Sequence, residues 1–262
     1  MAIAMGAASA RAPAETVLIT GANQGIGLEF AKQYAARGWT VIATHRRTTT
    51  PVELAKLAER YPQVRIERMD VTDAAQIEAL GGKLEGVPID ILLHNAALVR
   101  SDPLDRPGGN ANQLFGTLDY GLLDDFIHAN VAGPLKITAT FIENVKASRQ
   151  KKIIAISSAA GSVSVPPFMP NGAPLPDHYW YRISKAALNS AMRLLSAQFK
   201  DDGVTVVMFH PGGVQVESFG NVMLPGLVAP QEAIGNMIKT IDGLTSKDSG
   251  RFMDNDGKDH PW

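Results

Sequence analysis

The sequence predicts an α/β fold in which helices cover both faces of one mainly parallel, doubly wound sheet of about seven strands. From Val17 onwards, short apolar runs alternate with longer amphipathic segments, which is the pattern of βαβ units. Several runs are apolar at nearly every position, as expected for strands that helices cover on both sides. A glycine-rich turn directly follows the first run, where folds of this kind bind ligands.

The predicted strands are compact apolar or β-branched runs at Val17–Thr20, Thr40–Thr44, Val64–Met69, Ile89–His94, Lys152–Ser157 and Val204–Phe209. The first helix follows the glycine-rich turn, because Ile26, Phe30 and Tyr34 recur at helical spacing before Gly38 ends the pattern. Further helices are expected at Val52–Arg60, Ala74–Leu84, from about Leu118 to Lys146 and from about Tyr179 to Phe199.

A chain of 262 residues fits one large α/β domain, and no change in composition indicates a linker. We expect a flexible N-terminal tail over residues 1–15 and a single domain over residues 16–262. Two stretches, Ser101–Thr117 and Val165–Pro176, are rich in Gly, Pro or polar residues and follow strands, so they are expected at the ligand-binding edge of the sheet. Two disordered surface loops are the alternative. Substrate loops are assigned to residues 98–117, 162–178 and 213–229.

The composition excludes several classes of function. A net charge of −1 and a pI of 6.6 provide no basic surface for nucleic acid or an anionic membrane. The absence of cysteine excludes disulfides and thiolate chemistry, and no two histidines lie four residues apart, so no metal site is expected. No apolar run is long enough to cross a membrane, and residues 1–16 lack the charge order of a signal peptide. We therefore expect a soluble, cytoplasmic protein.

Residues Thr20–Gly27 join the first strand to the first helix and form a candidate dinucleotide site. Glycines let the backbone turn tightly and approach a pyrophosphate, while a helix N-terminus offers N–H groups and a partial positive charge. The spacing G-x-x-x-G-x-G indicates a dinucleotide site because it lies between a strand and a helix. The expected contacts are Gly21, Asn23, Gln24, Gly25, Ile26 and Gly27.

The end of the second strand indicates which dinucleotide binds. NAD sites usually carry Asp or Glu there to bind the ribose hydroxyls. Here Thr44–Arg47 reads Thr-His-Arg-Arg, and a guanidinium binds a 2′-phosphate through charge-assisted hydrogen bonds. We expect NADP(H) rather than NAD(H), with Arg46 as the contact; a solvated arginine pair is the alternative. Asp70 and Val71 are also assigned to the cofactor site, although Asp70 has an alternative role as a helix N-cap, which Asp73 fits better.

Tyr181 and Lys185 lie four residues apart and therefore on one face of a predicted helix. A free phenol has a pKa of about 10, and a nearby ammonium or a positively charged nicotinamide would favour its phenolate. An ordinary amphipathic helix is the alternative. Ser158, after the fifth strand, can hydrogen-bond a substrate carbonyl, and no G-x-S-x-G elbow makes it a nucleophile. Asn130 is a poor helix former inside a predicted helix, which favours a non-structural role.

These motifs together resemble the short-chain dehydrogenase/reductase superfamily. TGANQGIG resembles its T-G-x-x-x-G-x-G turn, His94–Ala97 stands where the superfamily has N-N-A-G, YRISK resembles Y-x-x-x-K, and Pro211-Gly212 resembles its P-G motif. The motifs run in the superfamily's order from about residue 16 to residue 214. ANQGIGLE, ARGWTVIATHR, YRISKAALN and the residues from Gly250 to Trp262 resemble the C-factor/sniffer-like carbonyl reductase branch.

The resemblance implies a Rossmann-type fold and a role for each matching residue. Tyr181 would be the general acid in reduction and the base in oxidation, and Lys185 would lower its pKa and hold the nicotinamide ribose. Ser158 matches the catalytic serine, and Asn130 matches the asparagine that holds a water in the proton relay. The remaining cofactor contacts implied by the motifs are Asn95, Ala96 and Ala97 near the adenosine ribose, and Pro211, Gly212 and Val214 near the nicotinamide.

The chain departs from the superfamily's pattern at four places. Ala97 replaces a glycine, and Gln24 stands where many NADP-using relatives carry Arg or Lys. Val216 replaces the threonine of P-G-x-x-x-T, so another group must orient the nicotinamide amide. The interval from Ser158 to Tyr181 is about ten residues longer than usual, and its Pro-rich segment is expected to form a lid or wall of the pocket or to alter the oligomer surface.

The predicted function is hydride transfer between NADP(H) and a carbonyl or secondary alcohol. A catalytically silent NADP(H)-binding regulatory module is the alternative, and an epimerase or dehydratase is disfavoured because only a short segment follows Pro211. Relatives usually pair two long helices into a four-helix interface, so a homodimer or homotetramer is expected. An apolar or aromatic substrate is expected because the candidate pocket residues are mostly apolar: Leu98, Val99, Val163, Phe168, Met169, Trp180, Val214, Phe219, Val222 and Met223.

Overall fold

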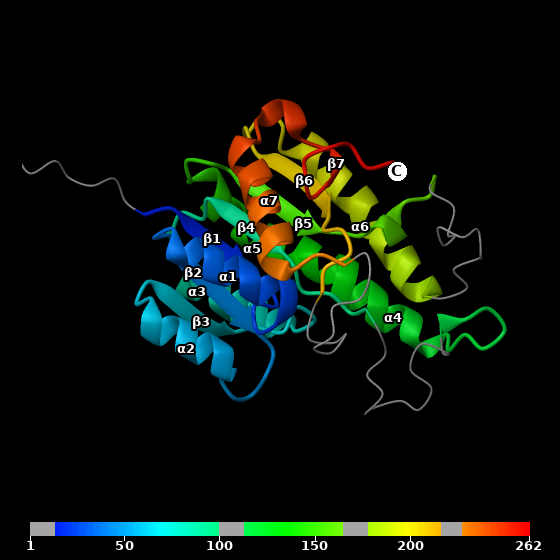
Figure 1. Cartoon of the computed structure of the whole chain (residues 1–262), viewed down its shortest axis with the longest axis horizontal. Coiled ribbons are helices and arrows are strands. Elements are labelled where there is room, and N and C mark those ends of the chain that lie inside the picture. The colour runs from blue at the N-terminus through cyan, green and yellow to red at the C-terminus, as the bar shows by residue number, and fades with distance from the viewer. Residues whose placement is uncertain (1–13, 100–112, 165–177, 216–226) are drawn as a thin grey trace, which may run out of the picture.

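Seven parallel strands form one sheet in the order β3-β2-β1-β4-β5-β6-β7 in the computed structural model (Figure 1), which describes residues 14–99, 113–164, 178–215 and 227–262. The strands are β1 (Thr16–Ile19), β2 (Thr40–His45), β3 (Val64–Arg68), β4 (Ile91–His94), β5 (Lys152–Ile156), β6 (Thr205–His210) and β7 (Phe252–Asp254). The predicted fold class is confirmed, and the six predicted strands coincide with β1 to β6. The expected tail over residues 1–15 lies almost entirely outside the described residues.

Helices pack on both faces of the sheet (Figure 1). α1 (Gly25–Ala36), α2 (Val52–Arg60) and α7 (Pro230–Gly243) cover one face, and α3 (Ala74–Lys83), α5 (Gly133–Lys146) and α6 (Tyr179–Gln198) cover the other. The helices α2, α3 and α6 begin at the predicted residues. α7 was not predicted from the sequence, although a proline in its first turn and buried apolar side chains at helical spacing mark it.

The helix expected from about Leu118 to Lys146 is confirmed from Gly121 to Lys146, but a π-helical turn that the sequence did not predict lies within it. α4 (Gly121–Ile127) leads into a π-helical turn at His128–Ala132, and α5 follows. Pro134 has no backbone N–H, so the regular hydrogen bond from its position to residue 130 cannot form. Gly133 permits a close approach, because a Cβ there would overlap the carbonyl oxygen of Val71. π-turns of this kind occur frequently at functional sites.

The core follows the alternation of side chains along the strands. Val17 and Ile19 of β1 point to the layer of α1, α2 and α7, whereas Leu18 points to the layer of α3, α5 and α6. All three side chains are fully buried. Burying such a side chain stabilises the fold by roughly 1.5–3 kcal/mol. The central strands therefore form a stable support for the residues at the edge of the sheet.

The topology places the predicted site residues at one edge of the sheet. All strands run parallel, so their carboxyl ends meet at the same edge. β1 pairs with both β2 and β4, and the strand order therefore reverses direction at β1. Ligands of open α/β sheets bind outside the carboxyl ends of the strands at such a switch point. No helix of the described segments is long and apolar enough to cross a membrane.

Candidate active site

The turn between β1 and α1 is shaped by close contacts that only glycine permits. Gly21 has a φ of +66°, and a Cβ on it would lie 2.9 Å from the Cα atom of Ala96. A Cβ on Gly27 would overlap both the carbonyl oxygen of Gly21 and the side-chain amide of Asn95. The turn therefore brings bare backbone to the surface of the switch point, which is the geometry that a pyrophosphate requires.

A hydrogen-bond network ties this turn to the end of β4. The side-chain amide of Asn95 donates to the carbonyl oxygens of Thr20 at 2.9 Å and Gly21 at 3.0 Å. In return, the Thr20 hydroxyl accepts from the backbone N–H groups of Asn95 and Ala96, both at 3.0 Å. The sequence analysis placed Asn95 and Ala96 at the site but did not assign Thr20 a role, although Thr20 opens the quoted motif.

The N-terminus of α1 fits a phosphate group. Gln24 is the N-cap, makes no side-chain capping hydrogen bond and is followed by a first turn without acidic residues. The partial positive charge of the helix end is therefore not neutralised within the helix. Asn23 and Ile26, also predicted contacts, lie partly buried in the same turn, between Gly21 and Gly27.

Two arginines follow β2 beside the turn. Arg46 and Arg47 are both exposed, and a guanidinium nitrogen of Arg47 donates to the Gln24 side-chain oxygen at 3.3 Å. Arg47 therefore reaches the glycine-rich turn, a contact that the sequence analysis did not predict. His45 precedes them and is buried, and its pKa is lowered first by burial and then by the charge of Arg47. The end of β2 thus carries positive charge and no acid.

The remaining predicted cofactor contacts also lie after strands. Asp70, after β3, accepts from the backbone N–H and the hydroxyl of Thr72, at 3.0 and 2.8 Å. Asp73 caps α3 by accepting from the N–H of Gln76, as the sequence indicated. Val71 is partly buried, and its carbonyl oxygen faces Gly133, so it supports the start of α5.

Beyond β6 the backbone turns at Pro211 and Gly212. Gly212 has a φ of +79°, and the Asn255 side-chain amide donates to the carbonyl oxygen of Pro211 at 2.9 Å. Val214 is buried and pairs with Val228 in a short parallel bridge. Ala97 lies after β4 and is exposed. Val216 lies outside the described residues, so its predicted effect on the nicotinamide stays a prediction.

The structure brings Ser158, Tyr181 and Lys185 together from two elements. Ser158 follows β5, and Tyr181 and Lys185 lie in the first turns of α6. Ser158 lies close enough to Tyr181 for its hydroxyl to lower the pKa of the phenol. The Lys185 ammonium lies 5.7 Å from the centre of the Tyr181 ring and donates to the carbonyl oxygen of Ile156 at 2.7 Å. The arrangement presents one phenol and one hydroxyl that can address the same substrate oxygen.

Burial dominates the proton affinities of these groups. It raises the pKa of Tyr181, and the hydrogen bond from Ser158 opposes that shift. It lowers the pKa of Lys185 from 10.5 to about 7, because only 2% of this side chain is exposed and an ammonium is disfavoured there. Tyr181 is therefore a neutral proton donor at neutral pH, while Lys185 titrates near neutrality.

Asn130 lies in the π-helical turn and connects three elements. Its side-chain oxygen accepts from the N–H of Leu98 at 2.7 Å, and its amide donates to the carbonyl oxygen of Leu98 at 2.8 Å and to the Ser184 hydroxyl at 2.9 Å. Ser184 in turn donates to the carbonyl oxygen of Tyr181. Both amide hydrogens of Asn130 are thus engaged, and a relay water would be held by an oxygen of this residue. The role of Ser184 was not predicted.

Part of the predicted pocket can be placed. Leu98, Val99, Val163 and Val214 lie at the carboxyl edge of the sheet, whereas Trp180 is buried against Leu122 and Phe126 and donates to the carbonyl oxygen of Asp119. Trp180 is therefore a core residue. The other predicted pocket residues lie outside the described residues: Phe168, Met169, Phe219, Val222 and Met223.

Comparison with known proteins identifies the family. The short chain dehydrogenase family model matches residues 15–223, which is most of the chain. The chain belongs to this family. The dehydrogenase is 32% identical over 254 residues to the 1-hydroxy-2-glutathionyl-2-methyl-3-butene dehydrogenase of Rhodococcus sp. (strain AD45), covering 94% of this chain and 99% of the relative. It is also 31% identical over 176 residues to the C-signal of Myxococcus xanthus, covering 67% of this chain and 93% of the relative.

Among solved structures, the dehydrogenase is similar to an NADPH-bound carbonyl reductase from chicken fatty liver. The TM-score is 0.80 at 32% identity, and the match covers 95% of this chain and 99% of the other. The similarity to C-signal and to a carbonyl reductase confirms the resemblance to the C-factor/sniffer-like branch. The dehydrogenase is accordingly an oxidoreductase.

Proposed function

We propose that the dehydrogenase transfers a hydride between NADP(H) and a carbonyl or secondary alcohol, with Tyr181 as the general acid and base. The observation that carries the proposal is the place of Lys185: its buried ammonium donates to the carbonyl oxygen of Ile156, two residues before Ser158, and lies 5.7 Å from the centre of the Tyr181 ring at the carboxyl edge of the sheet. In this family the edge also holds a glycine-rich dinucleotide turn, and here that turn is intact from Gly21 to Gly27.

In the reductive direction, Tyr181 donates its phenolic proton to the substrate oxygen as negative charge develops there. The hydroxyl of Ser158 donates a second hydrogen bond to the same oxygen and stabilises the charge. The Lys185 ammonium, when protonated, stabilises the resulting phenolate across the 5.7 Å that separates it from the ring centre. Bound NADP(H) supplies or accepts the hydride.

The charge at the end of β2 favours NADP(H) over NAD(H). A carboxylate at this position would repel a 2′-phosphate, and the segment instead carries Arg46 and Arg47, both exposed beside the turn. The similar chicken carbonyl reductase structure holds NADPH. Arg46 is the proposed 2′-phosphate contact, and Asp70, Asn95 and Pro211 lie at strand ends suited to the adenine, ribose and nicotinamide parts of the cofactor.

The side chains that follow β4 and β6, next to the proposed catalytic groups, favour an apolar substrate. Leu98 and Val99 follow β4, and Val214 follows β6, so aliphatic side chains flank the edge at which Ser158 and Tyr181 meet. An aromatic or aliphatic aldehyde or ketone fits these walls, and so does the corresponding alcohol in the oxidative direction.

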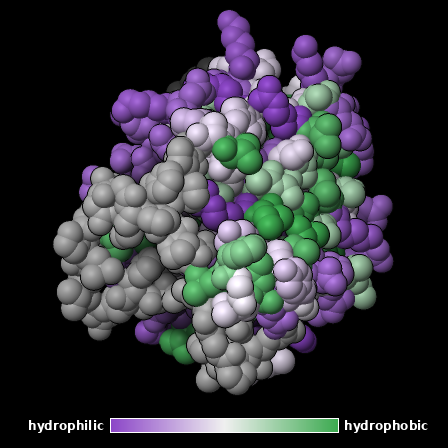
Figure 2. All heavy atoms as spheres, turned by 90° about the vertical axis from the view of Figure 1, so that its right-hand side faces the viewer, coloured by the Kyte–Doolittle hydropathy of each residue, from purple (hydrophilic) through white to green (hydrophobic). Residues whose placement is uncertain are grey.

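Self-association is proposed through the face that carries α4 and α6. Figure 2 views the molecule from the side on which these helices lie in Figure 1 and shows apolar side chains gathered among polar ones. Exposed apolar side chains on α6 include Tyr179, Ile183 and Leu194. A homodimer or homotetramer would cover such a face.

The function is tested by following oxidation of NADPH and of NADH by the purified full chain with a panel of aromatic and aliphatic carbonyls. Wild type is expected to turn over with NADPH, and Tyr181→Phe to lose about 100- to 10,000-fold in kcat while still binding NADPH, because it lacks the proton donor. The matched control is Tyr179→Phe, since Tyr179 lies on the same helix but is 40% exposed. Its kcat should equal that of wild type.

Two results would contradict parts of this proposal. A clear preference for NADH would refute the role of Arg46 but leave the role of Tyr181 intact. Tight NADPH binding without turnover of any carbonyl or alcohol, in either direction, would refute the enzymatic function and favour a catalytically silent binding module.

A further inference from the structure

The backbone after Ser158 is held by an imidazole instead of a strand. The β5–β6 ladder extends to a hydrogen bond from the N–H of Ser157 to the carbonyl oxygen of Phe209, at 2.8 Å. The next inter-strand bond at this edge comes from the N–H of Ala159, which donates to Nδ1 of His210 at 3.1 Å. The chain then turns at Pro211, which has no backbone N–H. A side chain thus continues the ladder past the catalytic serine.

This contact constrains Ser158 from its C-terminal side. Ser158 is extended, with φ and ψ of −164° and 153°, and its hydroxyl oxygen accepts from the N–H of Ala160 at 3.1 Å. The hydrogen bond from the N–H of Ala159 to His210 fixes the peptide unit that joins Ser158 to Ala159. The backbone of Ser158 is therefore held on one side by β5 and on the other by His210.

The geometry also fixes the chemical form of His210. A backbone N–H can donate to Nδ1 only when that nitrogen carries no proton, so the ring is neutral and protonated at Nε2. Burial, followed by the charge of His260, lowers the pKa of His210 to about 4, and the carboxylate of Asp254 opposes this shift. His210 therefore accepts a hydrogen bond throughout the neutral pH range.

The C-terminal segment, residues 255–262, packs against this ring. The ring of His260 lies 5.1 Å from that of His210 in an edge-to-face arrangement, and its Nδ1 lies 2.8 Å from a carboxylate oxygen of Asp254. The backbone N–H of His260 donates to the carbonyl oxygen of Phe252 in β7. His260 thus connects the last strand to the ring that holds Ser158.

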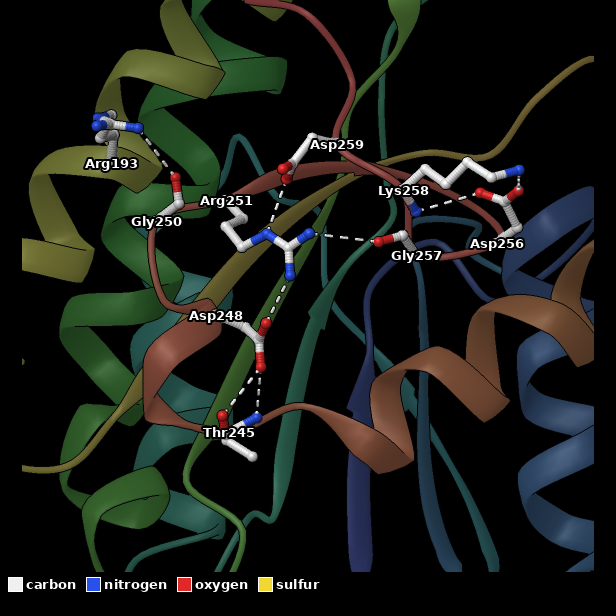
Figure 3. A network of polar contacts seen from close by, with 9 residues as sticks. All are labelled: Arg193, Thr245, Asp248, Gly250, Arg251, Asp256, Gly257, Lys258 and Asp259. Carbon is white, nitrogen blue, oxygen red and sulfur yellow. Dashed lines mark hydrogen bonds and ion pairs between the residues drawn. The ribbon is translucent and has the colours of Figure 1, made fainter.

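The ion pair of Arg251 with Asp259 joins the C-terminal segment to the residues before it (Figure 3). The guanidinium of Arg251 pairs with Asp248 at 2.6 Å and with Asp259 at 2.7 Å, and Lys258 pairs with Asp256 at 2.6 Å. At the end of the segment, the backbone oxygen of Trp262 accepts from the N–H of Ser164. The segment therefore contacts the loop that follows Ser158 as well as the ring of His210.

We propose that His210 is a positioning residue for Ser158, and that the C-terminal segment, through His260, holds His210 in register. The proposal rests on the catalytic role of Ser158 proposed above. Its physical reason is that catalysis depends on the placement of the hydroxyl to within a fraction of an ångström, and a displacement of about 1 Å can cost about 100-fold in rate.

The test compares two substitutions of His210 in the full chain. His210→Phe keeps a ring but removes the acceptor, whereas His210→Asn places an amide oxygen close to the position of Nδ1. We expect His210→Phe to lower kcat by about 10- to 100-fold with KM for NADPH changed by less than about twofold. His210→Asn should retain a kcat within a few-fold of wild type. Equal losses in the two variants, or no loss in His210→Phe, would overturn the proposal.

Two further measurements make the test independent of the folding of His210→Phe. In wild type, the ¹⁵N chemical shifts of the His210 imidazole should report a neutral ring protonated at Nε2, and a proton on Nδ1 at neutral pH would overturn the proposal. His260→Phe keeps the ring contacts but removes the bond to Asp254, and an unchanged kcat would overturn the role of the segment. Absence of turnover in wild type would instead refute the proposed function, and the tautomer measurement would still test the geometry of His210.

Discussion

Replacing Gly27 by alanine tests whether the turn between β1 and α1 is as close-packed as the structure indicates. The added Cβ would lie well inside 3.0 Å of both the Gly21 carbonyl oxygen and the Asn95 side-chain amide. One of these obstacles is backbone, and the other is an amide held by two hydrogen bonds, so neither can move cheaply. Overpacking of this kind typically costs about 1–3 kcal/mol.

The same displacement should weaken cofactor binding more than it weakens folding. Relief of the overlap requires α1 to move away from Gly21 or Asn95 to move away from Thr20, and both movements widen the proposed pyrophosphate site. We expect the midpoint of thermal unfolding of Gly27→Ala to fall by about 2–10 °C. We expect its Kd for NADPH to rise at least about tenfold, because a lost charge-assisted hydrogen bond is worth about 1.5–3 kcal/mol.

Gly82→Ala is the matched control. Gly82 lies in α3, and a Cβ on it would meet nothing within 4 Å. Alanine in an exposed helix should stabilise the protein by about 0.5–1 kcal/mol and leave NADPH affinity unchanged. Differential scanning calorimetry and NADPH fluorescence titration measure both quantities for the two variants. If Gly27→Ala matched Gly82→Ala in stability and affinity, the close approach at the turn would be refuted.

Two other predictions concern the buried polar groups around the site. Burial lowers the pKa of His94 from 6.5 to about 3, so protonation favours the unfolded chain, and the stability that the neutral ring confers above about pH 6.5 is lost as the pH falls towards 3. Between about pH 7.5 and about pH 5, the free energy of unfolding of wild type should therefore fall by about 2 kcal/mol more than that of His94→Asn. Urea denaturation measures both, and an equal fall in the two proteins would contradict this prediction. Asn130→Ala should destabilise the protein by about 2 kcal/mol or more, because it leaves the backbone N–H and carbonyl oxygen of Leu98 without their partners. Ser184→Ala removes the hydroxyl's bonds with Asn130 and with the carbonyl oxygen of Tyr181 but leaves both bonds to Leu98, so it should cost less; equal costs would contradict the assignment.

The fold was predictable from the sequence where burial leaves a simple pattern. β1 and β4 to β6 are covered on both faces, so their sequences are nearly continuous apolar runs. β7 has three residues, too few for any periodicity, and it exists because Phe252–Asp254 pairs with β6. The π-helical turn between α4 and α5 depends on Pro134 and on the close approach of Gly133 to Val71, and the second of these is a tertiary contact.

The proposed catalytic groups could be named from the sequence because the chemistry proposed for them depends on local spacing. Tyr181 and Lys185 share a helix face at a separation of four residues, and Ser158 follows β5 by two residues. Thr20, Ser184 and His210 were not assigned roles, because each acts by binding a residue distant in sequence. The role of His210 cannot be inferred from its place before a proline, because it depends on the packing of β5 beside β6.

Burial adjusts Tyr181 and Lys185 in opposite senses, and this matters for the direction of the chemistry. Removing the phenol from water raises the pKa of Tyr181 and keeps it protonated, which suits donation to a carbonyl oxygen. Removing the amine from water lowers the pKa of Lys185 to about 7, so the positive charge that would favour phenolate is itself easily lost.

In the protein alone the neutral phenol is therefore favoured, and the reverse reaction depends on additional positive charge near the ring. An oxidised nicotinamide carries such a charge and a reduced one does not. In the proposed mechanism, Tyr181 would thus act as an acid or as a base according to the redox state of the cofactor, and Ser158, positioned by His210, would bind the substrate oxygen in both directions.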